Sequence, residues 1–181
     1  MRIVAGDFKG RRLIMPEGKD VRPTTEKVKE AIFSMIQFDL EDAVCIDVFA
    51  GIGNLGLEAL SRGASHCYFC DASRQSLELV RKNIEMCKAE EYSTIMQGDY
   101  SKTLAAINEQ ADIIFLDPPY RMGLMLDCFD KIRDHDRLAE DGIIVAEHGE
   151  REILDDEISG FVKIKEKKYG SIVVSIYGHN A

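Results

Sequence analysis

The stretch "DVFAGIGNLGLEAL", residues 47–60, joins the end of an apolar run to the beginning of a helical pattern. Within it, Gly51, Gly53 and Gly56 have the spacing G-x-G-x-x-G. Glycine lets the backbone turn tightly and come close to a ligand at the N-terminus of a helix. Asp71 ends the next apolar run about 20 residues later, where an acid can bind the hydroxyls of a ribose. The stretch therefore predicts a strand, a loop that binds a nucleotide-like ligand, and a helix.

The rest of the chain alternates between short apolar runs and helical patterns. Strands are predicted at residues 43–50, 66–72, 92–99, 111–119 and 142–148. Helices are predicted at residues 22–36, 54–63, 73–87, 101–108 and 122–135. Two more strands are predicted within residues 161–178, joined at Lys168, Tyr169 and Gly170. This order predicts an α/β fold with a doubly wound, mostly parallel, Rossmann-like sheet of about seven strands that ends in an antiparallel hairpin.

The size and composition of the chain fit one globular domain. It has 181 residues, of which 45% are hydrophobic and 30% are charged. We expect a single domain over residues 1–181, with an N-terminal extension over 1–23 that holds a short β-hairpin and a core over 24–181. No apolar run is long enough to cross a membrane, and the N-terminus lacks the apolar centre of a signal peptide. A cytoplasmic location is expected.

The cysteines and histidines do not have the spacing of a metal site. The four histidines are scattered, and Cys67 and Cys70 form a single C-x-x-C pair without the second pair that zinc would need. Because positions three apart on a strand point to opposite faces of a sheet, these two thiols are expected to be separated and buried. We expect no metal. The five cysteines are Cys45, Cys67, Cys70, Cys87 and Cys128.

Acidic residues lie at the ends of three predicted strands: Asp47, Asp71 and Asp99. The carboxyl ends of parallel strands meet at the edge of the sheet where α/β folds bind ligands. A rim of acids suits S-adenosylmethionine, which carries an amine and a sulfonium and no phosphate, better than the pyrophosphate of NAD. Each acid also has a structural interpretation, since Asp99 can cap a helix and Asp47 can orient the loop.

The turn "DPPY", residues 117–120, follows the fourth of these strands. Proline ends a strand, so Asp117 is expected at the same edge as the glycine loop. The carboxylate of Asp117 and the backbone carbonyl of Pro118 can accept the two N–H groups of an amine on a nucleobase. Pro119 stiffens the turn, and Tyr120 offers a face on which the base can stack, worth about 1–3 kcal/mol. The turn therefore predicts a catalytic site that orients an exocyclic amine.

Charge is unevenly distributed along the chain. The net charge is -9, yet residues 1–30 contain eight Lys or Arg and five acids. The basic N-terminal part can bind phosphate locally, while the acidic remainder argues against a surface that is generally coated with nucleic acid. A solvated basic hairpin is the simpler alternative.

Together these motifs resemble a known family. "DVFAGIGNLGLEALSRGA" with "DPPY" resembles S-adenosylmethionine-dependent methyltransferases of the class I, amino-methylating type. "RIVAGDFKGRRL", "RPTTEKVKEAIFSMI" and "KKYGSIVVSIY" extend the resemblance over nearly the whole chain to the bacterial small-subunit (16S) ribosomal RNA guanine-N2 methyltransferases, the RsmD family. The resemblance implies methyl transfer to a guanine N2 in ribosomal RNA, either free or in a partly assembled small subunit.

The resemblance also implies which residues form each site. It implies RNA contact by Arg11, Arg12, Arg22 and Thr24. One departure is Asp71, where the family commonly carries Glu. The cofactor-binding residues that it implies are Asp47, Phe49, Gly51, Gly53, Asn54, Gly56, Asp71, Asp99 and Tyr100.

Three other interpretations remain open at this point. Amino methylation of DNA or of a protein glutamine amide uses a similar turn, although the chain has no separate recognition domain for either substrate. An NAD-dependent oxidoreductase would use the glycine loop but would leave the DPPY turn unexplained. A non-catalytic RNA-binding assembly factor would have no need of an intact Asp117 and Tyr120.

Overall fold

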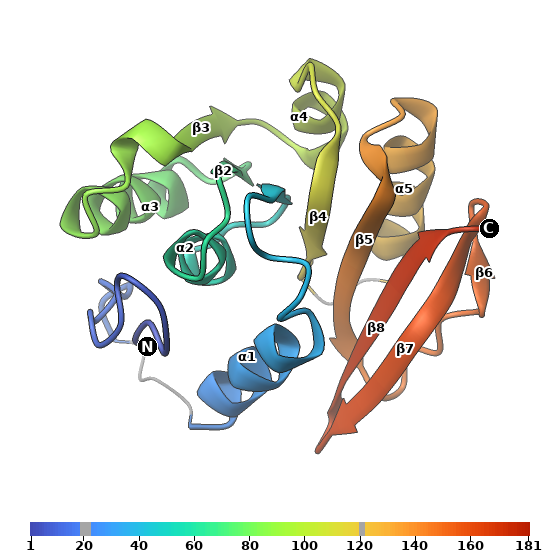
Figure 1. Ribbon diagram of the computed structural model, residues 1–181, viewed down its shortest axis with the longest axis horizontal. Coiled ribbons are helices and arrows are strands. Elements are labelled where there is room, and N and C mark those ends of the chain that lie inside the picture. Colours follow the sequence, from blue (N-terminus) through green and yellow to red (C-terminus); the bar gives the residue numbers. More distant parts are fainter. Residues whose placement is uncertain (19–22, 120–121) are drawn as a thin grey trace.

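The computed structural model of the chain describes residues 1–18, 23–119 and 122–181, and Figure 1 shows how its elements are arranged. The helices are α1 (Pro23–Met35), α2 (Asn54–Ser61), α3 (Arg74–Met86), the short 3-10 helix η1 (Glu90–Tyr92), α4 (Tyr100–Ala106) and α5 (Met122–Asp134). The strands are β1 (Val44–Asp47), β2 (His66–Asp71), β3 (Ser93–Gln97), β4 (Ala111–Leu116), β5 (Leu138–Gly149), β6 (Glu157–Ile158), β7 (Phe161–Tyr169) and β8 (Ile172–His179).

These strands form one sheet in the order β3-β2-β1-β4-β5-β8-β7-β6. The first five strands of the chain pair in parallel, with Asp47 beside Phe69 of β2 and Phe115 of β4. β8 is inserted between β5 and β7 and runs antiparallel to both. The predicted doubly wound parallel sheet with a final antiparallel hairpin is therefore confirmed. Its central strand, β1, brings the glycine loop to the middle of the sheet edge.

The structure corrects three details of the predicted elements. The sheet has eight strands because β6, with only two residues, is too short to produce a sequence period. β5 begins at Leu138 rather than at residue 142, since the polar residues Glu140 and Asp141 disguise its exposed beginning. Near the N-terminus, the expected hairpin is reduced to a single antiparallel bridge between Arg2 and Arg12.

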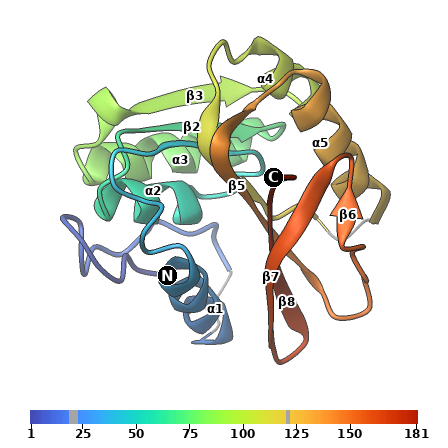
Figure 2. The same ribbon diagram turned by 45° about the vertical axis from the view of Figure 1, so that its right-hand side comes forward.

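Helices cover both faces of the sheet, as Figure 2 shows from the side. The apolar faces of α1, α2 and α3 pack on one side, where Phe33, Leu57 and Val80 lie in one core cluster. Those of α4 and α5 pack on the other side, where Leu104 and Phe129 lie in a second cluster. None of the helices in the described part of the chain is long and apolar enough to cross a membrane.

Side chains of one strand alternate between these two clusters. In β2, Cys67 lies in the cluster with α1 to α3, whereas Cys70 lies in the cluster with α4 and α5. All five cysteines are buried and free. Burial raises the pKa of the Cys67 thiol and raises that of Cys70 to about 12, so both stay protonated at neutral pH. The expected separation of the C-x-x-C pair is confirmed.

The N-terminal segment, residues 1–18, is tied to the core by buried polar groups rather than by strand pairing. Glu58 of α2 accepts hydrogen bonds from the backbone N–H groups of Val4 at 2.9 Å and Ala5 at 3.2 Å. Lys29 of α1 lies 3.0 Å from Glu58, and both side chains are buried. Breaking such a buried pair costs about 3–5 kcal/mol, so the segment is held firmly beside the sheet edge.

Candidate active site

A large pocket lies at the carboxyl ends of β1, β2, β3 and β4. Its volume is about 690 Å³, which is within the usual range for small-molecule sites. Met1, Met15 and Pro16 of the N-terminal segment form part of its wall. The pocket brings together residues predicted for the cofactor and for the catalytic turn, namely Phe49, Gly51, Asn54, Asp71, Asp99, Tyr100, Asp117 and Pro119.

Each glycine of the loop has a different structural role. Gly51 and Gly53 have φ values of 60° and 90°, in the left-handed region that favours glycine, and Gly53 caps the N-terminus of α2. Gly56 lies inside α2, where a Cβ atom would lie 2.4 Å from the ring of Phe69 and 2.7 Å from the sulfur of Cys67. Two glycines therefore shape the turn, and the third lets α2 pack closely on β2.

Two carboxyl groups accept hydrogen bonds from backbone N–H groups of this glycine motif. Asp71 accepts a hydrogen bond from the N–H of Gly51 at 3.0 Å and another from that of Ser73 at 2.9 Å. Asp47 accepts one from the N–H of Gly56 at 3.2 Å. The interpretation of Asp47 as a residue that orients the loop is thus realised in the structure. Loop donors that face carboxylates are not directed at a pyrophosphate, which disfavours a dinucleotide at this loop.

The far wall of the pocket combines a helix cap with an aromatic surface. Asp99 caps α4 by accepting a hydrogen bond from the N–H of Lys102 at 2.9 Å, and it also lines the pocket. The rings of Phe49 and Tyr100 are 6.0 Å apart between centroids and tilted by 46°. The hydroxyl of Tyr100 donates to Asp127 at 2.5 Å, and this hydrogen bond, with burial, raises the pKa of Tyr100 to about 12. The wall can hold a flat ring.

The charges around the pocket select the kind of ligand that fits. Asp71, Asp99 and Asp117 line it, and the described lining residues include no Lys or Arg. Acidic side chains in such a lining repel phosphate and attract amines, sulfoniums and ribose hydroxyls. The residues present therefore fit S-adenosylmethionine and do not fit NAD.

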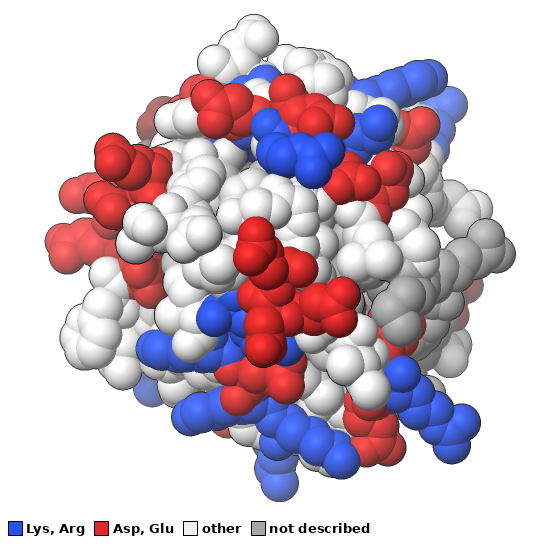
Figure 3. All heavy atoms as spheres, turned by 90° about the vertical axis from the view of Figure 1, so that its right-hand side faces the viewer, with Lys and Arg blue, Asp and Glu red and all other residues white. Residues whose placement is uncertain are grey.

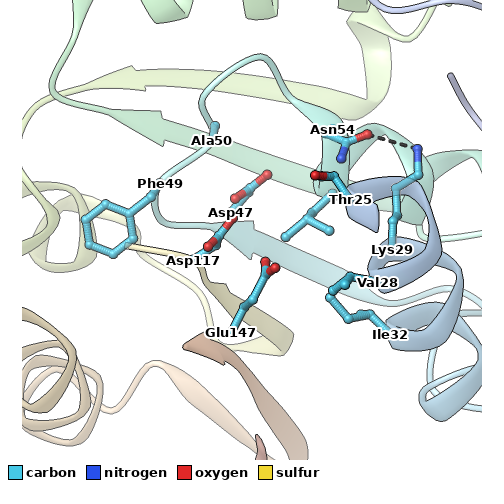
Figure 4. A pocket seen from close by; sticks show the side chains of 11 residues that line it. Thr25, Val28, Lys29, Ile32, Asp47, Phe49, Ala50, Asn54, Asp117 and Glu147 are labelled. Carbon is cyan, nitrogen blue, oxygen red and sulfur yellow. Dashed lines mark hydrogen bonds between the residues drawn. The ribbon is translucent and has the colours of Figure 1, made fainter. Parts of the chain in front are cut away.

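A smaller cavity opens beside the large pocket, with a volume of about 80 Å³. Phe49, Ala50, Asn54 and Asp117 line both spaces, so the two are contiguous. Figure 4 shows three carboxyl groups lying together in the smaller cavity, those of Asp47, Asp117 and Glu147. Asp47 therefore lies below the predicted rim rather than in the lining of the large pocket.

Removal from bulk water raises the pKa values of these three acids. For Asp117, which is exposed at the large pocket, a hydrogen bond with Glu147 opposes the rise in pKa. Burial raises the pKa of Asp47 to about 7, against the lowering effect of the Gly56 N–H and with help from the charges of Asp117 and Asp71. Burial also raises the pKa of Glu147 to about 9, aided by the charge of Asp117 and by a hydrogen bond with it. Because Asp117 and Glu147 repel each other when both are ionised, the pair retains a proton at neutral pH, and the higher pKa of about 9 assigns this proton to Glu147.

Glu147 was not predicted as a site residue. It lies near the carboxyl end of β5, so the signal that selected the other acids, their position at a strand end, applies to it as well. Its neighbour His148 points to the other side of the strand and is buried, with Nε2 2.8 Å from the hydroxyl of Ser175. His148 is thus a core residue of β5 whose ring is hydrogen-bonded.

Lys29 lies across the smaller cavity from the three acids. Its ammonium group donates to the side chain of Asn54 at 2.9 Å, as Figure 4 shows, and also to the carbonyl of Arg2. Its carboxylate partner is Glu58, at 3.0 Å. Burial lowers the pKa of Lys29, and the attraction of Glu58 works against this effect. The lysine therefore links α1, α2 and the N-terminal segment.

The residues expected to contact RNA are placed differently from one another. Arg11 donates to the carbonyl of Cys87 at 3.0 Å and lies 5.3 Å from the ring centre of Phe8. Arg12 is exposed and lines a surface hollow of about 400 Å³. Thr24 lies in α1, but its side chain is outside the described part of the chain. Arg22 and the catalytic candidate Tyr120 lie outside the described residues.

The remaining predicted residues complete the arrangement. Pro118 is partly buried and lies outside the lining of the large pocket, and Gly53 and Gly56 support that pocket without lining it. Among the described residues, no cluster of three or more His, Cys, Asp or Glu could hold a metal ion.

A doubly wound sheet with a glycine loop, an acid-lined pocket and a D-P-P turn at one edge defines an S-adenosylmethionine-dependent methyltransferase.

Known proteins resemble this chain over its full length. The family model described as "Conserved hypothetical protein 95" matches residues 1–178. The Bacillus subtilis protein named "Putative rRNA methyltransferase YlbH" is 37% identical over 180 residues, which cover 98% of each chain. "Ribosomal RNA small subunit methyltransferase D" of Escherichia coli is 32% identical over 181 residues, covering 100% of this chain and 91% of that protein.

A solved structure agrees with these relatives. The structure titled "Putative methyltransferase yhhF from Escherichia coli" has a TM-score of 0.89 and 32% identity, and the match covers 100% of this chain and 98% of that chain. The chain therefore belongs to the family described as Conserved hypothetical protein 95, and the resemblance to the RsmD family drawn from its motifs is confirmed.

Proposed function

We propose that this protein transfers a methyl group from S-adenosylmethionine to the exocyclic N2 amine of a guanine in small-subunit ribosomal RNA. The names of its full-length relatives, which are ribosomal RNA methyltransferases, support RNA as the substrate. The acid-lined pocket supports the cofactor, and the D-P-P turn supports an amine as the acceptor. Such a substrate also agrees with the expected cytoplasmic location.

One observation carries the proposal: Asp117 lines both the large pocket and the smaller cavity. An amine that donates to Asp117 therefore lies at the wall of the cofactor pocket. An exocyclic amine is a weak nucleophile because its lone pair is delocalised into the ring. Two acceptors, the carboxylate of Asp117 and the carbonyl of Pro118, can hold both N–H groups and leave the lone pair directed at the methyl group.

Most of the rate enhancement comes from this alignment rather than from a strong base. When bound, S-adenosylmethionine supplies a methyl group on a positively charged sulfur, which makes the methyl carbon electrophilic. The amine carries an extra proton after it has taken the methyl group, and Asp117 or a water molecule accepts that proton. A base in a duplex must first flip out of its stack, and we propose that Tyr120 then stacks on it.

The N-terminal segment is the part that we propose contacts the RNA backbone. Arg2 and Arg12 line the surface hollow of about 400 Å³, and Met1 and Met15 line both this hollow and the large pocket. An RNA strand held at the hollow would thus lie next to the cofactor. Phosphate contacts there would position the base without reading its sequence.

The face formed by the C-terminal strands is less suited to RNA. Figure 3 shows that Lys and Arg intermix with Asp and Glu on this side of the molecule. Two of the four lysines of β7 are paired with acids, since Lys163 lies 2.8 Å from Glu166 and Lys168 lies 2.6 Å from Glu150. Lysines that already have a carboxylate partner release few counterions on binding, so these two add little affinity for phosphate.

Transfer of labelled methyl from S-adenosylmethionine tests the proposal directly. The acceptors are small-subunit particles and naked ribosomal RNA from cells that lack this protein, followed by nucleoside analysis. We expect N2-methylguanosine in at least one acceptor, and the better acceptor shows whether free RNA or an assembled particle is the substrate. Another methylated nucleoside would contradict the choice of base. Transfer only to DNA or protein in parallel reactions would contradict the choice of RNA.

A further inference from the structure

We propose that Glu147 is a positioning residue for methyl transfer: its protonated carboxyl group donates a hydrogen bond to Asp117 and holds that carboxylate toward the acceptor amine. The inference rests on the proposed function, since it assigns a role beside the same acceptor site. Glu147 does not touch the amine in this arrangement. It acts through Asp117.

The geometry places the two carboxyl groups together from adjacent strands. β4 and β5 pair in parallel with Leu116 opposite Ala146, so Asp117, the first residue after β4, lies beside Glu147, which is still within β5. Both line the smaller cavity, as Figure 4 shows, while Asp117 also faces the large pocket. Glu147 therefore approaches Asp117 from the side away from the cofactor.

The charges around Glu147 favour a shared proton. The charged groups that face it within the described part of the chain are Asp117 at the end of β4, Asp47 of β1 and Lys29 of α1. On β8, the residue paired with Glu147 is the apolar Val174. Lys29 already has Glu58 as its carboxylate partner, so no nearby cation is free to neutralise all three acids. A proton on Glu147 leaves one negative charge on the pair.

This arrangement has a consequence for the acceptor. With one oxygen of Asp117 receiving the proton of Glu147, the other oxygen is free to accept the N–H of the amine. The hydrogen bond also limits rotation of the Asp117 side chain. Loss of the donor would let the carboxylate turn away, and misplacement by about 1 Å can lower a rate about 100-fold.

Two substitutions of Glu147 separate the effect of its hydrogen-bond donor from the effect of its side-chain volume. Glu147→Gln keeps a hydrogen-bond donor of the same shape, whereas Glu147→Leu has similar bulk and no donor. We expect Glu147→Leu to lower kcat about 100-fold while the KM for S-adenosylmethionine stays within about threefold, and Glu147→Gln to restore most of the rate. Glu150→Gln, an exposed neighbour, is the control and should behave like wild type.

The pH profile adds a readout that a purely structural role would not change. Glu147 should lose its proton as pH rises through about 9. It then no longer donates a hydrogen bond to Asp117, and the pair carries two negative charges instead of one. The kcat of wild type should therefore fall relative to that of Glu147→Gln above this pH. Any ionisation of the guanine affects both enzymes equally and cancels in the ratio. A ratio that stays constant with pH, or Glu147→Gln as slow as Glu147→Leu, would overturn the proposal.

A titration without RNA distinguishes failure of this inference from failure of the proposed function. Carbon-13 NMR of the labelled glutamate carboxyls, assigned with Glu147→Gln, follows Glu147 in the whole enzyme. We expect it to titrate well above pH 7, and at lower pH in Asp117→Asn. A Glu147 that titrates near the ordinary value of about 4.3 would refute the shared proton whatever the acceptor is.

Discussion

Asp71 accepts a hydrogen bond of 3.0 Å from the backbone N–H of Gly51 and thereby joins the end of β2 to the first glycine of the loop. This contact gives the acid two roles, because Asp71 also lines the large pocket. The side chain of Asp71 is long enough to reach the loop directly. Asp71 therefore both holds the glycine loop in place and forms part of the pocket rim.

Asp71→Ala should weaken binding of S-adenosylmethionine. The substitution removes the contact proposed for the ribose and releases the N–H of Gly51. A hydrogen bond to a charged group contributes about 1.5–3 kcal/mol, which corresponds to a 10- to 100-fold loss of affinity at about 1.4 kcal/mol per factor of ten. Isothermal titration calorimetry measures this loss, with the exposed Glu78→Gln as the control. Unchanged affinity would remove Asp71 from the cofactor site.

Asp117→Ala should abolish turnover and leave cofactor binding nearly intact. The carboxylate orients the amine, so we expect a loss in kcat of at least about 100-fold. The Kd of S-adenosylmethionine should stay within about threefold, because Asp117 lies where the two cavities meet rather than beneath the glycine loop. Methyl transfer and calorimetry on the same preparation test both statements, and Asp134→Asn on the surface of α5 is the control. A parallel loss of cofactor binding would contradict the assigned role.

Asp47 should make the free energy of unfolding depend on pH. Burial raises its pKa to about 7, so between roughly pH 4 and 7 the folded protein retains a proton that the unfolded chain has released. The stability contributed by this residue therefore falls as pH rises through that window. Asp47→Asn removes the ionisation and can still accept from the N–H of Gly56.

We expect the stability of Asp47→Asn relative to wild type to increase by about 2 kcal/mol from pH 5 to pH 7.5. Urea unfolding without cofactor at both pH values measures the difference, and the exposed Asp141→Asn should show no such change. A difference that is the same at both pH values would mean that Asp47 titrates normally.

Gly56→Ala should destabilise the fold. The added Cβ would lie 2.4 Å from the ring of Phe69 and 2.7 Å from the sulfur of Cys67, which forces α2 away from β2. Overpacking of this kind costs about 1–3 kcal/mol, or a fall in Tm of about 2–4 °C for each kcal/mol in a chain of this size. Gly149→Ala has no atom within 4 Å of its new Cβ and is the matched control. Equal Tm values for the two variants would contradict close packing at Gly56.

Arg12→Ala should lower RNA affinity without changing stability. The side chain is exposed beside the surface hollow, so its loss removes a phosphate contact and reduces the salt dependence of binding by about one counterion. Filter binding at several salt concentrations measures the slope, and Lys167→Ala on β7 should leave it unchanged. An effect from Lys167 equal to that from Arg12 would place the RNA elsewhere.

Arg11, its neighbour in sequence, has different surroundings. Contact with RNA is predicted for both arginines, and Arg11 also donates to the carbonyl of Cys87 and lies over the ring of Phe8. Nothing in the sequence "KGRRL" distinguishes them, because the difference depends on which side chain faces α3. The strand periods and the glycine spacing, by contrast, depend on local geometry and are readable from the chain alone.

The sequence by itself determined the order of strands and helices, the glycine loop and the positions of Asp47, Asp71, Asp99 and Asp117 at strand ends. These features are local, because side-chain periodicity and backbone freedom act within a few residues. Only the tertiary structure decided which groups meet. The pairing of β4 with β5 places Glu147 beside Asp117, and the packing of α1 on α2 buries Lys29 against Glu58. Protonation of the buried acids depends on such distant neighbours, since burial and nearby charges together set a pKa.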